Sequence, residues 1–457
     1  MNKQREKFSS RLGFILISAG CAIGLGNVYR FPIITGAYGG AFFVLIYLVF
    51  LLLLGLPVMC AELAVGRASQ RSIATSFDVL EKKGHKWHFM KYLGIGGNYL
   101  LMMCYTTIAG YMLTYLFKYI KGDILQIQEA KALSEHFAET VANPVTTLIS
   151  AFIVIIVCFA ICSLGLKNGV EKITKVMMIA LFTLIIFLAI YCCTLSGAGE
   201  GLKFYLIPSI ESIKEAGVWT TISAAMGQAF FTLSIGMGSI AVFGSYIGKD
   251  RGLLGEAATI ISLDTMIAVT SGLIVFPACF TYNNGVTADA GTVDSSFLFT
   301  TLSKIFNSMP AGRLIGSLFF LFILFAALST VIAVFENIMS FWLELTNLSR
   351  TKIAIINIFL LLVLSIPAAF NYSIFSSVKI FGMDIMGFED SIVSNFILPF
   401  GSLVYVVFCT SRYGWGWKNF FAEVNSGSGP KLPKWIKPYM CYVLPLIIAF
   451  ILIIQLF

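Results

Sequence analysis

The chain has 457 residues, of which 58% are hydrophobic and only 12% are charged, a balance far from that of soluble domains. This composition excludes an ordinary soluble protein and indicates a polytopic membrane protein with no nucleic-acid partner, although the formal net charge is +8. The ten cysteines fall almost wholly within apolar stretches and lack the spacings of a disulfide framework or a zinc site.

Eleven apolar stretches of about 20 residues, the length that crosses a bilayer, follow one another along the chain. The first is not preceded by a cleavable signal peptide, because residues 1–11 are polar and the run that follows has the length of a span. We expect an all-α membrane protein with spans near 12–36, 41–65, 92–120, 145–164, 170–194, 219–247, 255–280, 312–344, 352–370, 386–411 and 438–457.

Charge sorts to one side of these spans. If the amino terminus is cytoplasmic, the inner segments hold 22 Lys and Arg and the outer segments hold 8, while Arg30 lies within the first span. The positive-inside rule then predicts a cytoplasmic amino terminus and a short carboxyl terminus outside.

The first span is interrupted at mid-depth by the small residues of segment 20–27, GCAIGLGN. A break inside a bilayer frees backbone groups that only protein, water, a ligand or an ion can satisfy. The carbonyls of Gly20, Ala22 and Ile23 would suit a hard cation. The N–H groups at the start of the outer half-helix would suit a carboxylate, and they belong to Leu25 and Gly26. The alternative is close helix packing at small residues.

A second span carries a matching break at 231–238, FTLSIGMG. Each break opens a set of five spans, residues 11–194 and 219–412, and an odd number of spans inverts the second set relative to the first. Inverted five-span repeats that begin with discontinuous helices indicate a secondary transporter with its site at the repeat interface. The stretch 438–457 lies outside this repeat.

Several polar side chains lie well inside these apolar stretches. Asp264 is the most informative, because a carboxylate at membrane depth is costly unless it is paired or bound to a cation. Ser and Thr hydroxyls in such helices often only bond a preceding carbonyl. With Asn27, Thr232 and the freed carbonyls, Asp264 offers an all-oxygen ligand set that suits sodium. The polar side chains inside the spans are Asn27, Thr232, Ser234, Asp264, Ser329 and Thr330. Glu62 could accept bonds from the unwound backbone of the second break.

Four charged residues lie toward the two ends of the spans. Arg30 and Asp390 lie toward the outside, and Arg5 and Glu344 toward the inside. Each pair could be a gate that forms and breaks as the site changes sides. Interfacial charges without partners are the alternative.

Taken together, four motifs resemble the neurotransmitter:sodium symporter family, in its bacterial amino-acid transporter branch. Arg5-Glu6, SRLG at 10–13 and GLGNVYRFP at 24–32 are similar to the family's first helix, and GQAFFTLSIGMG at 227–238 is similar to its sixth. The resemblance covers nearly the whole chain and implies a transporter in the bacterial cytoplasmic membrane that uses sodium.

The resemblance implies two sodium sites and a pocket between them. The first site would comprise the Ala22 carbonyl with Asn27, Thr232, Asp264 and the substrate carboxylate. The second would comprise the carbonyls of Gly20, Ile23 and Ala326 with Ser329 and Thr330. The substrate site would comprise Ala22, Gly24, Leu25, Gly26, Leu101, Tyr105, Phe231, Thr232, Ser234, Met237, Ser329 and Val334.

The pocket residues imply a substrate class. Tyr105 matches the tyrosine that holds the substrate carboxylate, and the pocket offers no charged residue for a charged side chain. We therefore expect a neutral, apolar or aromatic L-amino acid. An amine without a carboxylate is disfavoured, because Gly24 stands where the monoamine carriers have Asp.

Two positions depart from the family pattern. Several members carry Asn at Asp264 and the animal transporters bind chloride nearby, whereas a fixed carboxylate supplies that charge itself, so we expect chloride independence. Some bacterial relatives have Gly, nine residues and then Pro in the fifth span, but here Gly169 is followed at that spacing by Ile179. Proline-assisted unwinding of that span is therefore not expected from the pattern.

Three rival functions belong to other classes. A channel would need a continuous polar lining, yet the polar residues cluster at mid-depth. An intramembrane enzyme would need a nucleophile with a base or clustered metal ligands, and no span contains histidine. A sensor that binds without transporting would share the same pocket.

Overall fold

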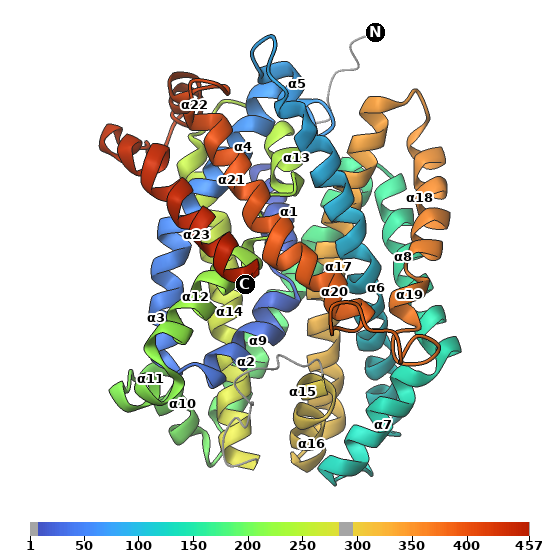
Figure 1. The fold of residues 1–457 in the computed structure, drawn as a ribbon. Helices are drawn as coiled ribbons and strands as arrows, with labels where there is room; N and C mark the ends of the chain where they lie inside the picture. The colour runs from blue at the N-terminus through green and yellow to red at the C-terminus, as the bar shows by residue number, and fades with distance from the viewer. Residues whose placement is uncertain (1–7, 283–295, 457) are drawn as a thin grey trace.

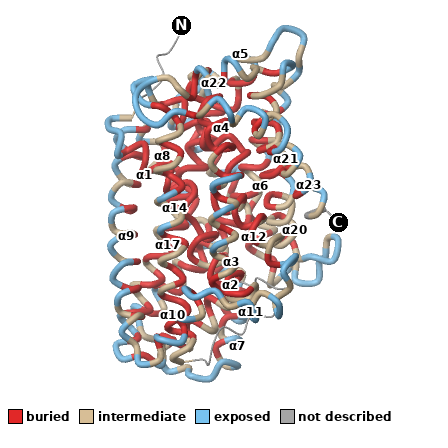
Figure 2. Tube along the Cα trace, turned by 90° about the vertical axis from the view of Figure 1, so that its left-hand side faces the viewer, coloured by how far each residue is buried: buried red, intermediate tan, exposed pale blue. Residues whose placement is uncertain are grey.

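The protein, described by a computed structural model over residues 8–282 and 296–456, is built from helices, and these residues contain only two isolated β-bridges and no strand. Figure 1 shows the long helices standing side by side along one axis, and Figure 2 shows buried residues concentrated between them. The predicted all-α membrane fold is thereby confirmed.

The expected spans correspond to single helices or to helices joined through short π-helical turns. They are α1 (Arg11–Ala22), η1 (Gly26–Arg30) and α2 (Phe31–Ala37); α3 (Ala41–Phe50), η2 (Leu51–Gly55) and α4 (Leu56–Ser69); α6 (Met90–Lys121); α8 (Pro144–Ser163); η4 (Leu166–Glu171) and α9 (Lys172–Cys193); α12 (Val218–Leu233) and α13 (Ser239–Ser245); α14 (Leu253–Tyr282); α17 (Gly312–Leu345); α18 (Arg350–Leu364) and α19 (Ile366–Ala369); α20 (Ile385–Ser391), η5 (Ile392–Ile397) and α21 (Leu398–Thr410); η7 (Tyr439–Val443) and α23 (Leu444–Leu456).

Shorter helices lie in the connections between the spans. They are α5 (Ser76–Leu80), η3 (Trp87–Phe89), α7 (Ala130–Ala142), α10 (Ala198–Leu206), α11 (Ile210–Ala216), α15 (Ser296–Phe299), α16 (Thr301–Ser308), α22 (Trp417–Val424) and η6 (Lys434–Ile436).

The number of spans can be compared with the eleven expected. By length and hydropathy, eight continuous helices of the described chain can cross a bilayer, and α1 with Gly26–Ala37, bent by 57°, is a ninth broken span. The two remaining stretches, 219–247 and 352–370, correspond to shorter pairs, α12 with α13 and α18 with α19. The chain is therefore a multi-pass membrane protein, and the count of eleven stays a prediction.

Both expected helix breaks are present. α1 stops at Ala22, and a helix resumes at Gly26 as the π-helical turn η1. α12 stops at Leu233, and α13 begins at Ser239. The backbone between them turns through left-handed conformations at Ser234, Gly236 and Gly238, with φ of 49°, 102° and 87°. Such angles suit glycine, which explains the glycine-rich sequence of this break.

The cysteines serve as small packing residues. All ten are free thiols, eight of them are buried, and only Cys193 and Cys441 are partly exposed. Every cysteine lies among the described residues, and none of them is joined in a disulfide there.

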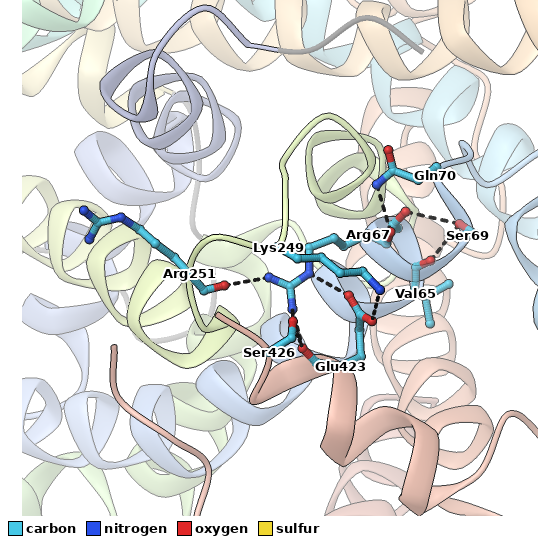
Figure 3. Close-up of polar contacts among 9 residues, drawn as sticks. Val65, Arg67, Ser69, Gln70, Lys249, Arg251, Glu423 and Ser426 are labelled. Atoms are coloured by element: carbon cyan, nitrogen blue, oxygen red, sulfur yellow. Dashed lines mark hydrogen bonds and ion pairs between the residues drawn. The ribbon is translucent and has the colours of Figure 1, made fainter. Parts of the chain in front are cut away.

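The buried side chain of Arg67 connects three segments at the end of the molecule where α5 and α22 lie (Figures 1 and 3). Arg67, only 1% exposed at the end of α4, donates to the Glu423 carboxylate of α22 at 2.7 Å and to the Arg251 carbonyl at 2.7 Å. It also donates to Ser426 at 2.6 Å, and Lys249 lies 3.1 Å from the second Glu423 oxygen. This ion-pair cluster fastens the connection before α14 to α22.

Replacing Arg67 by methionine is expected to lower the free energy of unfolding by roughly 3–5 kcal/mol. The substitution leaves the mostly buried Glu423 carboxylate with the exposed Lys249 as its remaining ion-pair partner. The thermal unfolding midpoint in detergent measures the effect. Arg71→Met is the matched control, since Arg71 is exposed four residues later. Equal midpoints for the two variants would contradict the structural role of Arg67.

Candidate functional site

A cavity lies where the two helix breaks meet α6. It contains about 390 Å³ of empty space, the open solvent at its mouth included. Ten of the twelve expected substrate residues line it; Ser329 and Val334 do not. The full lining is Ala22, Gly24, Leu25, Gly26, Leu101, Tyr105, Phe231, Thr232, Ser234, Met237, Thr330, Val393 and Leu398.

One wall of the cavity presents polar groups of the first break. The Tyr105 hydroxyl on α6 lies 3.1 Å from the Leu25 nitrogen and accepts its N–H. The Gly24 N–H donates to the Asn27 side chain at 3.0 Å, so that side chain closes the unwound turn. A hydroxyl and a main-chain N–H thus lie side by side where a carboxylate could bind both.

Three buried side chains from three helices form one hydrogen-bonded cluster beside this wall. The Asn27 amide donates to Thr232 Oγ1 at 2.9 Å and to Asp264 Oδ1 at 2.8 Å. Thr232 in turn donates to Asp264 Oδ2 at 3.2 Å. The first expected cation set is therefore assembled, and Ala22, its fourth member, lines the adjoining cavity.

Asp264 has no cationic partner among the residues that the structure describes. It is 0% exposed, and no Lys, Arg or His side chain among residues 8–282 and 296–456 lies within 4 Å of its carboxylate. A buried ionised carboxylate is stable only when a positive charge compensates it. The site is therefore suited to a small cation.

A second group of oxygens lies on the other side of the first break. Thr330 Oγ1 lies 3.1 Å from the Ile23 carbonyl and 3.3 Å from the Gly20 carbonyl. Ser329 Oγ lies 2.9 Å from the Ala326 carbonyl and 3.5 Å from that of Ile23. The five residues expected for a second cation site are thus brought together, all of them buried.

Glu62 supports the second break from α4. Its carboxylate accepts the N–H groups of Gly236 at 2.7 Å, Ile240 at 3.2 Å and Ala241 at 3.3 Å. The expectation that Glu62 binds the unwound backbone is confirmed. These bonds replace the intrahelical partners that the break removes.

Arg30 and Asp390, the residues expected at the outer gate, contact different partners in the structure. The Arg30 guanidinium carbon lies 4.1 Å above the centre of the Phe231 ring, and no ion pair links Arg30 with Asp390 in the part of the chain that the structure describes. Asp390 accepts a bond from Ser394 at 3.2 Å. The outer gate stays a prediction.

On the inner side, Glu344 accepts the Ser72 N–H at 2.6 Å and the Thr75 hydroxyl at 2.8 Å. Arg5 lies outside the described residues. The inner gate therefore also stays a prediction.

Three residues of the site had no role assigned from the sequence. Val393 and Leu398, from η5 and α21, line the cavity, but no motif in the sequence pointed to them. Gln228 donates to the Gly26 carbonyl at 2.9 Å across the two breaks. Gln228 lies inside the motif 227–238, and this was the only feature of the sequence that pointed to it.

The sequence matches one protein family over nearly its full length. The sequence model of the "Sodium:neurotransmitter symporter family" matches residues 5–126 and 124–457. The chain is 31% identical to the uncharacterized sodium-dependent transporter YhdH of Bacillus subtilis, over 94% of this chain and 92% of that protein. It is 30% identical to an uncharacterized sodium-dependent transporter of Haemophilus influenzae, over 100% and 99% of the two chains.

A solved structure and a more distant relative extend the comparison. The crystal structure of MhsT in complex with L-phenylalanine superposes with a TM-score of 0.86 at 34% identity, covering 99% of this chain and 100% of MhsT. The sodium- and chloride-dependent taurine transporter of Rattus norvegicus is 25% identical over 72% of this chain and 58% of its own length.

Proposed function

The chain belongs to the sodium:neurotransmitter symporter family, and from this we propose that it imports neutral, apolar or aromatic L-amino acids together with sodium by alternating access. Its family and fold are those of secondary transporters, not enzymes. The single observation that carries the proposal is the cavity that joins the Tyr105 and Leu25 polar wall to the buried Asp264 cluster.

The cavity wall supports the substrate class. Apart from the polar groups of the first break, its side chains are mostly apolar, and none of the described residues that line it is charged. A zwitterion with an apolar side chain could place its carboxylate at Leu25 and Tyr105 and its side chain among Leu101, Phe231 and Met237. MhsT, the structural relative, is crystallised with L-phenylalanine.

We assign two sodium ions to the two oxygen clusters. The first would bind between Asp264, Asn27, Thr232, the Ala22 carbonyl and the substrate carboxylate, so substrate and ion would be direct ligands of each other. The second would bind among the carbonyls and hydroxyls at Gly20, Ile23, Ala326, Ser329 and Thr330. Carbonyl, hydroxyl and carboxylate oxygens are the ligands that suit such a hard cation.

The transport cycle would couple these sites to two gates. Sodium orders the broken segments, substrate completes the first site, Arg30 and Asp390 close the outer side, and Arg5 with Glu344 releases the inner side. Each sodium ion that moves down the membrane potential supplies about 2.3 kcal/mol per 100 mV. We place the two repeats at 11–194 and 219–412, with 438–457 as an added helix.

We propose that the protein resides in the bacterial cytoplasmic membrane with its amino terminus inside and its carboxyl terminus outside. The 22 Lys and Arg of the inner segments against 8 of the outer segments support this orientation.

Uptake by proteoliposomes tests the proposed function. Labelled alanine, leucine, phenylalanine, tryptophan, lysine and glutamate are compared under an inward sodium gradient and under a matched potassium gradient. Sodium-driven uptake of the neutral members is expected, with none for lysine or glutamate. Binding without uptake would instead indicate a sensor, and the absence of both would refute the proposal.

Chloride replacement tests the role assigned to the fixed carboxylate. Initial rates of sodium-driven uptake are expected to be unchanged when gluconate replaces chloride on both sides, because Asp264 already provides a negative charge beside the first sodium position. Vesicles without protein control for leak. Collapse of uptake in gluconate would contradict the prediction and group the chain functionally with the relatives named as chloride-dependent.

A further inference from the structure

Met237, in the second break, lines the cavity with the side chain that can change its conformation most readily. It lines the cavity and is itself 1% exposed. Methionine has an unbranched side chain with three rotatable bonds and fills irregular spaces. Whatever holds its main chain and its sulfur in place therefore decides how large a substrate side chain fits.

The main chain at Met237 is held from three helices. Its carbonyl accepts the side-chain amides of Asn98 on α6 at 3.1 Å and Asn337 on α17 at 3.3 Å. The preceding Gly236 N–H donates to Glu62 on α4 at 2.7 Å. All of these partners are buried, so a shift of this backbone would leave polar groups without partners away from water. The backbone is thus fixed and only the side chain can adjust.

The sulfur of Met237 rests against a glycine. A Cβ atom added at Gly97 would lie 3.1 Å from Met237 Sδ and 2.8 Å from Ile397 Cγ2, closer than ordinary van der Waals contact. Gly97 does not itself line the cavity, but Leu101 and Tyr105 do. Residues four apart share one face of a helix, so Gly97, Leu101 and Tyr105 form a single stripe along α6.

We propose that Gly97 is a positioning residue that limits the size of the substrate side chain that the cavity accepts. Because Gly97 has no side chain, the Met237 sulfur can occupy the space beside it. A methyl group at this position would displace the sulfur, and with the main chain fixed the sulfur would move into the cavity. Ile397 precedes the lining residue Leu398, so its displacement would press on the same cavity. This inference rests on the proposed amino-acid transport.

The test compares Gly97→Ala with the unchanged protein in proteoliposomes. KM values of sodium-driven uptake are measured for alanine, valine, leucine, phenylalanine and tryptophan. The ratio of the phenylalanine KM to the alanine KM is expected to rise about tenfold or more, the scale on which one methylene group alters discrimination in an apolar pocket. The maximal rate for alanine is expected to stay near that of the unchanged protein.

The chain offers a matched control one residue away. Gly96 is exposed on the same helix, and a Cβ added there meets no atom within 4 Å. Gly96→Ala is therefore expected to keep the KM ratio of the unchanged protein. The double variant Gly97→Ala with Met237→Ala is expected to regain uptake of phenylalanine, since the sulfur that blocks the cavity is gone.

Each outcome decides one question. Equal KM ratios for Gly97→Ala and Gly96→Ala, or no recovery of phenylalanine uptake in the double variant, would overturn the inference about Gly97. Uptake by the unchanged protein would still support amino-acid transport. If Gly97→Ala does not fold, Met237→Ala is compared with the double variant, and a different KM ratio between these two would overturn the inference. Absence of uptake by the unchanged protein overturns the proposed function itself.

Discussion

Replacing Asp264 by alanine is expected to reduce sodium-driven uptake at least about 100-fold, since removing one partner from a buried charge pair costs roughly 3–5 kcal/mol. The carboxylate lies at the centre of the cluster with Asn27 and Thr232 and has no cationic side chain beside it among the described residues. Without it, the first sodium ion would lose its only charged side-chain ligand.

Thermal unfolding midpoints measured in sodium and in potassium media separate loss of the ion site from loss of folding. Sodium that binds only the native state raises the thermal unfolding midpoint, so the difference between sodium and potassium media should shrink in Asp264→Ala. Ser262→Ala is the control, because Ser262 is exposed on the same helix. Sodium-dependent uptake that persists unchanged in Asp264→Ala would refute the site assignment.

Replacing Gly24 by alanine is expected to weaken uptake by roughly ten- to a hundredfold, since overpacking a filled interior costs about 1–3 kcal/mol. The added Cβ would lie 2.5 Å from the Tyr105 hydroxyl and 2.8 Å from Thr330 Oγ1. It would push Tyr105 away from the Leu25 N–H and disturb the second oxygen cluster in one step.

KM and maximal rate of leucine uptake, together with the sodium concentration for half-maximal rate, measure this effect. We expect both the leucine KM and the sodium requirement to rise. Gly199→Ala provides the control, because Gly199 is exposed on α10 and a Cβ there meets no atom within 4 Å. Kinetics of Gly24→Ala that match this control would argue against close packing at Gly24.

The helical membrane fold and both breaks could be predicted because their signals are local. A run of about 20 apolar residues is readable as a span by composition alone. A cluster such as Gly236 and Gly238 is readable as a break because few other residues adopt its backbone angles. Glu62 could be assigned to the second break because a buried carboxylate requires donors.

The π-helical turns could not be predicted, and one of them, η5, contains or directly precedes two of the cavity residues that were missed, Val393 and Leu398. η5 lies between α20 and α21 and rotates the side chains that follow it, and no residue in 392–397 marks a π-helical turn. Val393 and Leu398 reach the cavity through this turn. Ser329 and Val334 were expected in the pocket; instead Ser329 bonds the Ala326 carbonyl and Val334 is fully buried outside the cavity lining.

The state of the cysteines makes the chain ready for thiol labelling. Eight thiols are buried, and the two partly exposed ones are Cys193, the last residue of α9, and Cys441 in η7. A single reporter thiol introduced as Ser391→Cys, next to Asp390, would be labelled in the presence of mostly buried native thiols. Its labelling rate with and without sodium would follow the opening of the outer side directly, with no native cysteine removed.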